Sequence, residues 1–133
     1  MRKIRLGRTG IEATAQSFGA LPIQRTETEE AVRILRAAVD GGINYFDTAR
    51  AYTDSEEKIG KAFSPSVRQG IYIATKSGGK NKEAVLNDIR KSLSLLKTDY
   101  VDLLQAHNIT AVPDENDENS IYAGLKEAQC LGY

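Results

Sequence analysis

Residues 71–79, IYIATKSGG, consist of a short apolar run that is followed directly by a polar, glycine-containing end. A run of this length bounded by turn residues is typical of a buried β-strand. The segment that follows it predicts an α-helix, because four leucine and isoleucine side chains recur there at helical spacing: Leu86, Ile89, Leu93 and Leu96. Residues 71–96 therefore predict one unit of strand, loop and helix.

The same unit recurs on both sides of this segment. Further strands are predicted at residues 16–21, 43–46 and 101–106, and further helices after the first strand, from about residue 55, and over residues 120–131. At the N-terminus, residues 3–6 and 11–15 flank turn residues and predict a small hairpin. Residues 110–119 are polar and predict a loop.

Two helix starts carry the pattern of a capping box, in which a Glu follows a Thr by three residues. The pairs are Thr26 with Glu29 and Thr53 with Glu56. Gly41 and Gly42 follow the first helix and predict its end, because glycine adopts the left-handed backbone of a helix C-terminus at little cost.

Strands that alternate with helices in this way predict a parallel α/β sheet whose strands are buried on both faces. A doubly wound sheet normally carries a G-x-G-x-x-G motif after its first strand, but residues 19–22 read GALP here. We therefore favour a TIM (β/α)8 barrel. A complete barrel takes about 250 residues, so the chain corresponds to the hairpin plus about four βα units. Residues 1–133 are interpreted as one half-barrel with no separate second domain.

Composition excludes several classes of function. Eighteen basic residues balance eighteen acidic ones, so the basic surface of a nucleic-acid-binding protein and the basic cluster of a membrane-surface protein are not expected. The single cysteine, Cys130, excludes an internal disulfide and a cysteine-based metal site. The N-terminal residues have no uninterrupted apolar stretch. We expect a cytoplasmic protein with small-molecule partners, no metal, no nucleic acid and no membrane.

Four polar side chains each stand just after one of the predicted strands: Asp47, Tyr52, Lys76 and His107. Lys76 follows Asp47 by 29 residues and His107 follows Lys76 by 31, which is the length of one βα unit. Side chains at the carboxyl ends of parallel strands share one edge of the sheet. The spacing predicts that an acid, a phenol, an amine and an imidazole converge there.

The segments around these residues carry a resemblance to a known family. Residues 46–52, FDTARAY, residues 74–77, ATKS, and residues 104–108, LQAHN, resemble the three active-site segments of the aldo-keto reductases, which are NAD(P)H-dependent enzymes on the TIM barrel. The motifs at residues 6–10 and 55–60 are similar too. Residues 21–24 and 51–55 are similar to those of bacterial members that carry a C-terminal iron–sulfur segment.

The resemblance implies reduction of an aldehyde or ketone to an alcohol. Carbonyl reduction needs an acid that protonates the developing alkoxide, and a lysine ammonium beside a phenol stabilises the phenolate. Tyr52 is then the proton donor, Lys76 its activator, Asp47 the partner of Lys76, and His107 the residue that orients the carbonyl.

The hydride requires a nicotinamide cofactor, because no side chain supplies one. In the family, the positions that match Gly19, Ala20, Leu21 and Asp47 lie at the nicotinamide, and Asn108 is expected at the substrate. The resemblance leaves NADH and NADPH both open.

Taken singly, each of these residues has an ordinary structural explanation, as a turn former, a packing aromatic, a surface amine or a loop histidine. Their joint spacing favours the catalytic interpretation. Cys130 is interpreted as a half-buried small residue, and residues 114–118 as a solvated acidic loop.

The missing half of the barrel leaves three hypotheses. The chain is the N-terminal portion of a reductase and is inactive alone, or it closes a barrel with a copy or a complementary half through its exposed edges, or it is a non-catalytic binding or regulatory relative.

Overall fold

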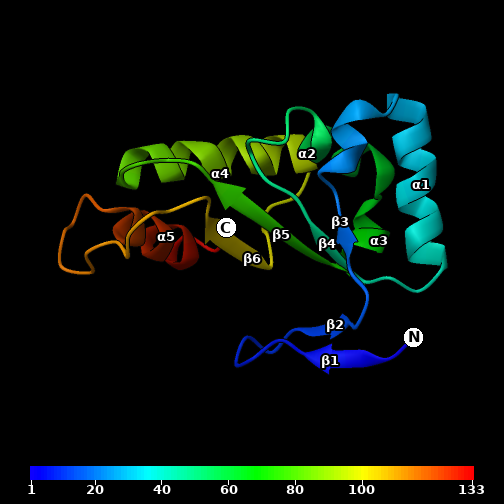
Figure 1. Cartoon of the computed structure of the whole chain (residues 1–133), viewed down its shortest axis with the longest axis horizontal. Coiled ribbons are helices and arrows are strands. Elements are labelled where there is room, and N and C mark those ends of the chain that lie inside the picture. The colour runs from blue at the N-terminus through cyan, green and yellow to red at the C-terminus, as the bar shows by residue number, and fades with distance from the viewer.

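The computed structural model describes all 133 residues and contains two sheets. Strands β1 (Lys3–Arg5) and β2 (Glu12–Thr14) form the predicted antiparallel hairpin, which lies outside the main sheet in Figure 1 and is joined to the segment before β4 by hydrogen bonds between β2 and Asn44. The second sheet has four strands in the order β3-β4-β5-β6, and every pairing is parallel. Its strands are β3 (Phe18–Gly19), β4 (Tyr45–Asp47), β5 (Tyr72–Ser77) and β6 (Leu103–Ala106).

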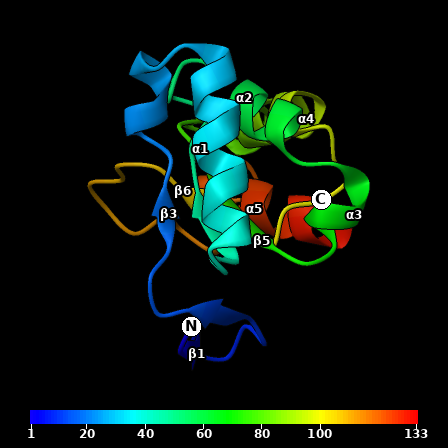
Figure 2. The same cartoon turned by 90° about the vertical axis from the view of Figure 1, so that its right-hand side faces the viewer.

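A helical segment separates each pair of neighbouring strands, as the sequence predicts (Figures 1 and 2). Right-handed crossovers between consecutive parallel strands place these helices on the same face of the sheet. The helices are η1 (Pro22–Arg25), α1 (Thr28–Asp40), α2 (Ser55–Ala62), α3 (Pro65–Arg68), α4 (Lys82–Leu96) and α5 (Ile121–Cys130).

The short helix α3 is absent from the sequence-based prediction. Ser64 caps it by accepting a hydrogen bond from the backbone N–H of Val67, and Pro65 occupies a first-turn position that needs no N–H donor. A serine followed by proline is a recognisable helix start, but four residues are too few to show hydrophobic periodicity.

Both predicted capping boxes are wrong. Helix α1 begins after Glu27 and α2 begins after Asp54, and neither N-cap residue makes a side-chain capping bond. Glu56 turns inward and is fully buried instead of bonding back to the start of α2. The predicted end of α1 is confirmed, because Gly42 has a φ of +91° immediately after the helix.

The hydrophobic core lies between the sheet and the helices. Phe46 of β4 is completely buried, and its ring packs 5.6 Å from the ring of Phe18 and 4.9 Å from that of Phe63, centroid to centroid. The other core side chains come from the same two layers and include Leu35, Ile59, Ile73, Leu86, Ile89 and Leu96. Burial of these side chains is the main stabilising contribution to the fold.

The second face of the sheet is only partly covered. Tyr45, Asp47, Tyr72 and Lys76 lie on it half-buried, and every residue of β6 is half-buried. The expectation that the strands are buried on both faces is therefore wrong for this chain. The sheet also ends in two edge strands, β3 and β6, each of which is paired on one side only. An open parallel sheet of this kind exposes backbone N–H and C=O groups at both edges.

Two smaller expectations have different outcomes. Cys130 is exposed at the end of α5, so its interpretation as a half-buried residue is wrong. Residues 114–118 are exposed, as expected of a solvated loop. No helix has both the length and the apolar character needed to cross a bilayer.

Candidate active site

An ion pair between Asp47 and Lys76 joins the carboxyl ends of β4 and β5. The Lys76 Nζ lies 2.6 Å from Asp47 Oδ2 and also donates a hydrogen bond of 2.8 Å to the backbone oxygen of Thr48. Asp47 is the last residue of β4 and β5 extends to Ser77, so both Asp47 and Lys76 lie within their strands rather than just after them. Its side chain is 16% exposed and that of Asp47 is 34% exposed. The ammonium is thus held in place while both groups remain open to solvent.

Tyr52 lies beside this ion pair, on the loop between β4 and α2. Lys76 Nζ lies 3.5 Å from the phenol oxygen of Tyr52 and 5.0 Å from the centroid of its ring. The backbone of Tyr52 is fixed on both sides: its N–H donates to Ala49, and its carbonyl accepts from the N–H of Ser55. A single ammonium therefore contacts both the carboxylate and the phenol.

His107 completes the group from the next strand. Its backbone N–H donates a 2.8 Å hydrogen bond to the carbonyl of Ser77, which continues the β5–β6 pairing beyond the end of β6. Its imidazole ring meets the ring of Tyr52 edge to face, with centroids 5.7 Å apart. The structure thus brings together the four side chains whose spacing predicted convergence.

The residues expected at the cofactor and substrate differ in their accessibility. Gly19 and Leu21 are exposed, and a Cβ at Gly19 would meet no atom within 4 Å. Ala20 is fully buried, its N–H donates to Asp47 and its carbonyl accepts from Ser55 Oγ. Of these three residues, only Gly19 and Leu21 present atoms to solvent. Asn108 is exposed next to His107, with a φ of +52°.

A second tyrosine lies on the same face of the sheet. Tyr45 precedes Asp47 by two residues on β4. Burial raises the pKa of the Tyr45 phenol above its usual value, and the negative charges of Asp47 and Asp102 raise this pKa further. Tyr45 is therefore held in its protonated form.

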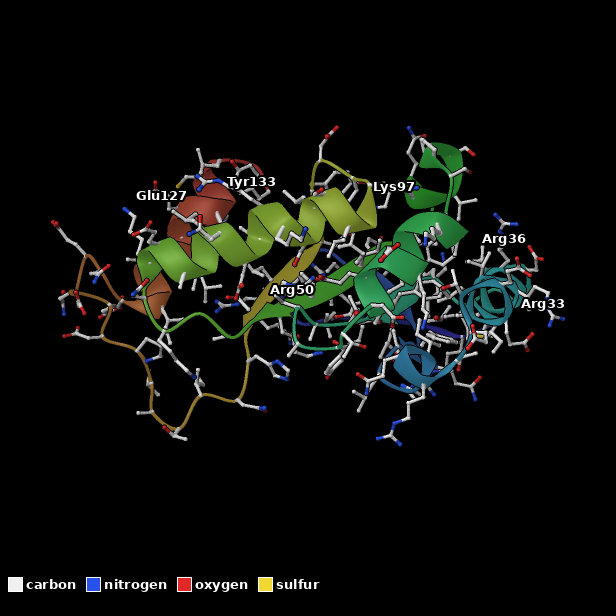
Figure 3. All side chains as sticks on the ribbon, turned by 90° about the horizontal axis from the view of Figure 1, so that it is seen from above. Arg33, Arg36, Arg50, Lys97, Glu127 and Tyr133 are labelled. Atoms are coloured by element: carbon white, nitrogen blue, oxygen red, sulfur yellow. The ribbon has the colours of Figure 1, made fainter.

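The sequence-based prediction missed a buried carboxylate that braces the site. Glu56 Oε1 accepts a 2.7 Å hydrogen bond from Thr75 Oγ1, and its second oxygen pairs with Arg50. Figure 3 shows Arg50 near the middle of the molecule, whereas Arg33 and Arg36 lie on α1 at one end. The available signal was that Glu56 shares a helix face with Ile59, three residues later, and so points toward the core.

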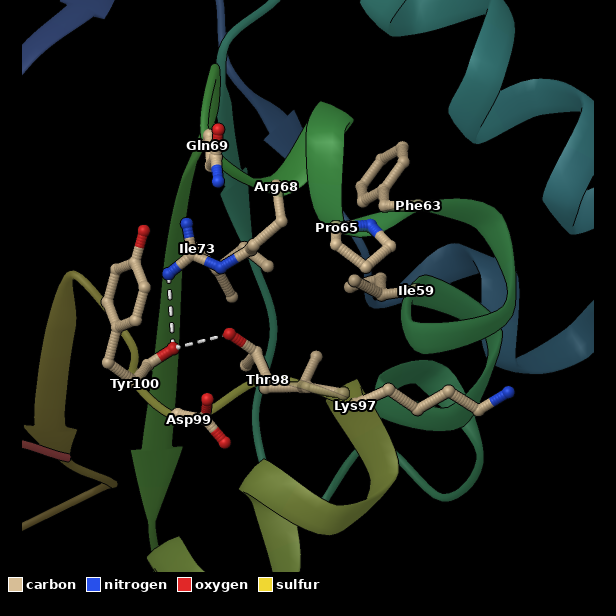
Figure 4. Close-up of a pocket in the computed structure, with 11 residues that line it drawn as sticks. Ile59, Phe63, Pro65, Arg68, Gln69, Ile73, Lys97, Thr98, Asp99 and Tyr100 are labelled. Atoms are coloured by element: carbon tan, nitrogen blue, oxygen red, sulfur yellow. Dashed lines mark hydrogen bonds between the residues drawn. The ribbon is translucent and has the colours of Figure 1, made fainter.

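A pocket of about 240 Å³ lies away from the four residues, beside the start of β5 (Figure 4). Arg68 lines it and donates hydrogen bonds to the backbone oxygens of Ile71 and Tyr100. Arg68 also pairs with Asp102, whose carboxylate accepts from the N–H of Ile73 as well. These hydrogen bonds connect the start of β5 with α3 and with the segment before β6, at the end of the strand opposite Lys76. No group of three or more His, Cys, Asp or Glu side chains is placed to hold a metal ion.

A family model for the aldo/keto reductase family matches residues 13–132. The chain belongs to this family. Strand order and parallel pairing agree with this assignment, because the chain superposes on about half the length of a solved aldo-keto reductase.

Three relatives show the extent of the match. The chain is 32% identical to the uncharacterised oxidoreductase YqkF of Bacillus subtilis, aligning over all of this chain and 47% of that protein. It is 27% identical to the NADPH-dependent codeinone reductase 1-5 of Papaver somniferum, over 94% of this chain and 46% of that protein. The holo form of aldo-keto reductase AKR11C1 from Bacillus halodurans superposes with a TM-score of 0.87 at 31% identity, over 99% of this chain and 47% of that structure.

The chain therefore spans about half the length of the curated relatives it matches. The expected fold is confirmed: the chain has the hairpin and the first strands of a TIM barrel.

Proposed function

We propose that this chain carries the proton-transfer residues of an NAD(P)H-dependent aldo-keto reductase that converts an aldehyde or ketone into an alcohol. The observation that carries the proposal is the position of Lys76 Nζ, 2.6 Å from the Asp47 carboxylate and 3.5 Å from the Tyr52 phenol oxygen. A charged ammonium held by a carboxylate stabilises negative charge on the phenol. Tyr52 can then give its proton to a carbonyl oxygen that has become an alkoxide.

The remaining roles follow from position. His107 lies against the ring of Tyr52 and is able to donate a hydrogen bond to the same carbonyl oxygen, which orients the substrate. Asp47 holds the Lys76 ammonium beside Tyr52. Asn108, exposed beside His107, is the residue we assign to substrate contact outside the reacting carbonyl.

The residues present fit a nicotinamide cofactor at this edge of the sheet. Gly19 leaves open space where other residues would have a Cβ, and Asp47 is accessible beside it on the neighbouring strand. Gly19, Leu21 and Asp47 would hold the nicotinamide end, with Ala20 packed beneath them. When bound, this cofactor supplies the hydride. The NADPH requirement in the name of the codeinone reductase is consistent with NADPH here, and NADH is the alternative.

The whole reaction requires surfaces beyond these residues. The chain corresponds to about half of its relatives, so we propose that residues 1–133 are one half-barrel domain whose activity appears in a completed barrel. Its single cysteine is consistent with a reducing cytoplasm, which we propose as its compartment. The proposed partner is a small carbonyl compound.

The test is NADPH oxidation with an aromatic aldehyde, for residues 1–133 alone and for the same residues joined to the C-terminal half of YqkF. We expect little turnover from the chain alone and measurable turnover from the joined protein. In the joined protein, Tyr52→Phe should lower kcat by about 100-fold or more, because it removes the proton donor, while NADPH binding is unchanged. Tyr122→Phe is the matched control, since Tyr122 is 39% exposed on α5. Turnover that survives Tyr52→Phe would refute the assignment.

The unpaired edges favour a second candidate function. Strands β3 and β6 are both free to add a parallel strand. We propose as the alternative that the chain pairs with a copy or a complementary half before it acts. Size-exclusion chromatography tests the pairing with a copy, because elution as a stable monomer of 14.6 kDa excludes it.

A further inference from the structure

The Glu56 carboxylate is completely buried, which is unusual for an acid that takes no direct part in the proposed chemistry. Only 1% of its surface is exposed. Burying a carboxylate is costly unless charged and hydrogen-bonding partners surround it. Glu56 has two such partners, and both belong to segments that carry reacting groups. Its burial therefore fixes the relative position of those segments.

The first partner is on the strand of Lys76. Thr75 Oγ1 donates a 2.7 Å hydrogen bond to Glu56 Oε1, and Thr75 is itself fully buried one residue before Lys76. Because successive side chains of a strand point to opposite faces, Thr75 points toward the helices while Lys76 points toward Tyr52. Glu56 thus holds β5 from its helix-covered face, at the residue next to Lys76.

The second partner is on the loop of Tyr52. Arg50 pairs with Glu56 Oε2, and its side chain is 22% exposed. The backbone N–H of Arg50 donates to the carbonyl of Lys76 at 3.0 Å, so the loop is also bound directly to β5. Arg50 is two residues from Tyr52. Glu56 therefore connects the strand of the ammonium with the loop of the phenol.

Other contacts fix the same loop and the helix after it without joining Glu56 to β5. The N–H of Thr48 donates to Ala74, and Thr48 Oγ1 bonds Ser55 Oγ at 2.9 Å. Lys58 Nζ donates to the carbonyl of Ile23. The first two contacts hold the ends of the loop, residues 48 and 55, and the third holds α2 beyond it, whereas the Arg50–Glu56 pair and the Arg50 backbone N–H hold its middle, next to Tyr52.

We propose that Glu56 is a positioning residue, which sets the distance between Tyr52 and the Lys76–His107 side of the site through Arg50 and Thr75. The inference rests on the proposed function only in naming those residues as the reacting groups. Its geometric content, that loss of Glu56 moves the Tyr52 ring relative to His107, is measurable without turnover.

His107 gives a direct probe of this geometry. It is the only histidine in the chain, so its imidazole signals in an NMR spectrum need no further assignment. The Tyr52 ring lies edge to face with it at 5.7 Å and shifts those signals through its ring current. The experiment compares the imidazole signals, and the cross-relaxation between the two rings, in wild type, Glu56→Gln, Tyr52→Leu and Asp102→Asn. The 133-residue chain is used throughout.

Tyr52→Leu gives the position of the His107 signals when the tyrosine ring is absent. In Glu56→Gln, the Arg50 ion pair is lost, and we expect the His107 signals to move most of the way toward their position in Tyr52→Leu and the ring-to-ring cross-relaxation to fall. Asp102→Asn is the matched control. Asp102 is also a carboxylate paired with an arginine and bonded to β5, but it is half-buried, with 16% of its side chain exposed, and it lies at the other end of that strand. We expect it to lower stability and to leave the His107 signals at their wild-type position.

Two results would overturn the proposal. The first is a folded Glu56→Gln protein with wild-type His107 signals and cross-relaxation. The second is an equal displacement in Asp102→Asn, which would mean that general loosening of the sheet moves the ring. If Glu56→Gln does not fold, Thr75→Val decides the question, because it keeps the volume and removes only the hydrogen bond to Glu56. Unchanged signals in that variant also overturn the proposal.

Discussion

Replacing Gly60 by alanine should destabilise this chain, although alanine is the better helix former. Gly60 lies inside α2 and faces the end of α4. Judged from the sequence alone, the substitution gains about 1 kcal/mol, because glycine is the less favourable residue inside a helix by about that amount. The structure reverses the sign of this expectation.

The magnitude follows from the distances at this position. A Cβ on Gly60 would lie 2.1 Å from the backbone oxygen of Leu95 and 2.9 Å from the carbonyl carbon of Leu96, whereas ordinary contact begins at 3.4 Å. Backbone atoms cannot rotate away as a side chain can, so α2 and α4 must separate. Overpacking costs about 1–3 kcal/mol where side chains adjust. Because the neighbour of Gly60 is rigid backbone, we expect a cost at the upper end of this range, about 3 kcal/mol. The net loss is then about 2 kcal/mol, or about 6–10 °C in Tm for a chain of this size.

Urea unfolding followed by far-UV circular dichroism measures this loss as a lower midpoint at unchanged slope. Gly78→Ala is the matched control, because a Cβ there meets nothing within 4 Å and the backbone φ is not positive. We expect its stability to stay within about 0.5 kcal/mol of wild type. A Gly60→Ala protein as stable as wild type would refute the close packing of α2 on α4.

Two further predictions concern single residues. Lys97 ends α4 with a left-handed backbone, φ +55° and ψ +46°, so Lys97→Gly should raise the free energy of unfolding by about 0.5–1 kcal/mol in the same urea assay. The raised pKa of Tyr45 means that the unfolded chain loses this proton first as pH rises above 10.0, so the folded state loses stability on the alkaline side. Tyr45→Phe should therefore lose less stability than wild type between about pH 9 and about pH 11; equal losses in the two proteins would contradict the burial of this phenol.

Much of the fold was predictable because its signals are local. The apolar runs and their spacing predict the parallel strands, and Gly42 marks the end of α1 as expected. The starts of α2 near residue 55 and of α5 near residue 120 are confirmed, but the two capping boxes failed because a Thr-x-x-Glu pattern has two outcomes. Glu56 forms a capping box only if it faces solvent, and here it faces the core, where Thr75 and Arg50 supply partners that lie elsewhere in the sequence.

The candidate site also contains some residues that the sequence predicts and others that it does not. The spacing of Asp47, Lys76 and His107 is fixed by the length of one βα unit, so their convergence followed from the sequence. The contacts of Glu56 could not be predicted in this way, because the pairing of Glu56 with Thr75 depends on how far α2 tilts toward β5. No periodicity in the sequence encodes that tilt.

In the main sheet, each strand pairs only with the strand before or after it in the sequence. Every pairing therefore closes a loop of similar length, about one βα unit, and no pairing has to bring the two ends of the chain together. The Asp47–Lys76 pair can form as soon as β5 has joined β4, before β6 has been synthesised. During synthesis from the N-terminus, the order in which the site assembles is then the order of the strands along the chain.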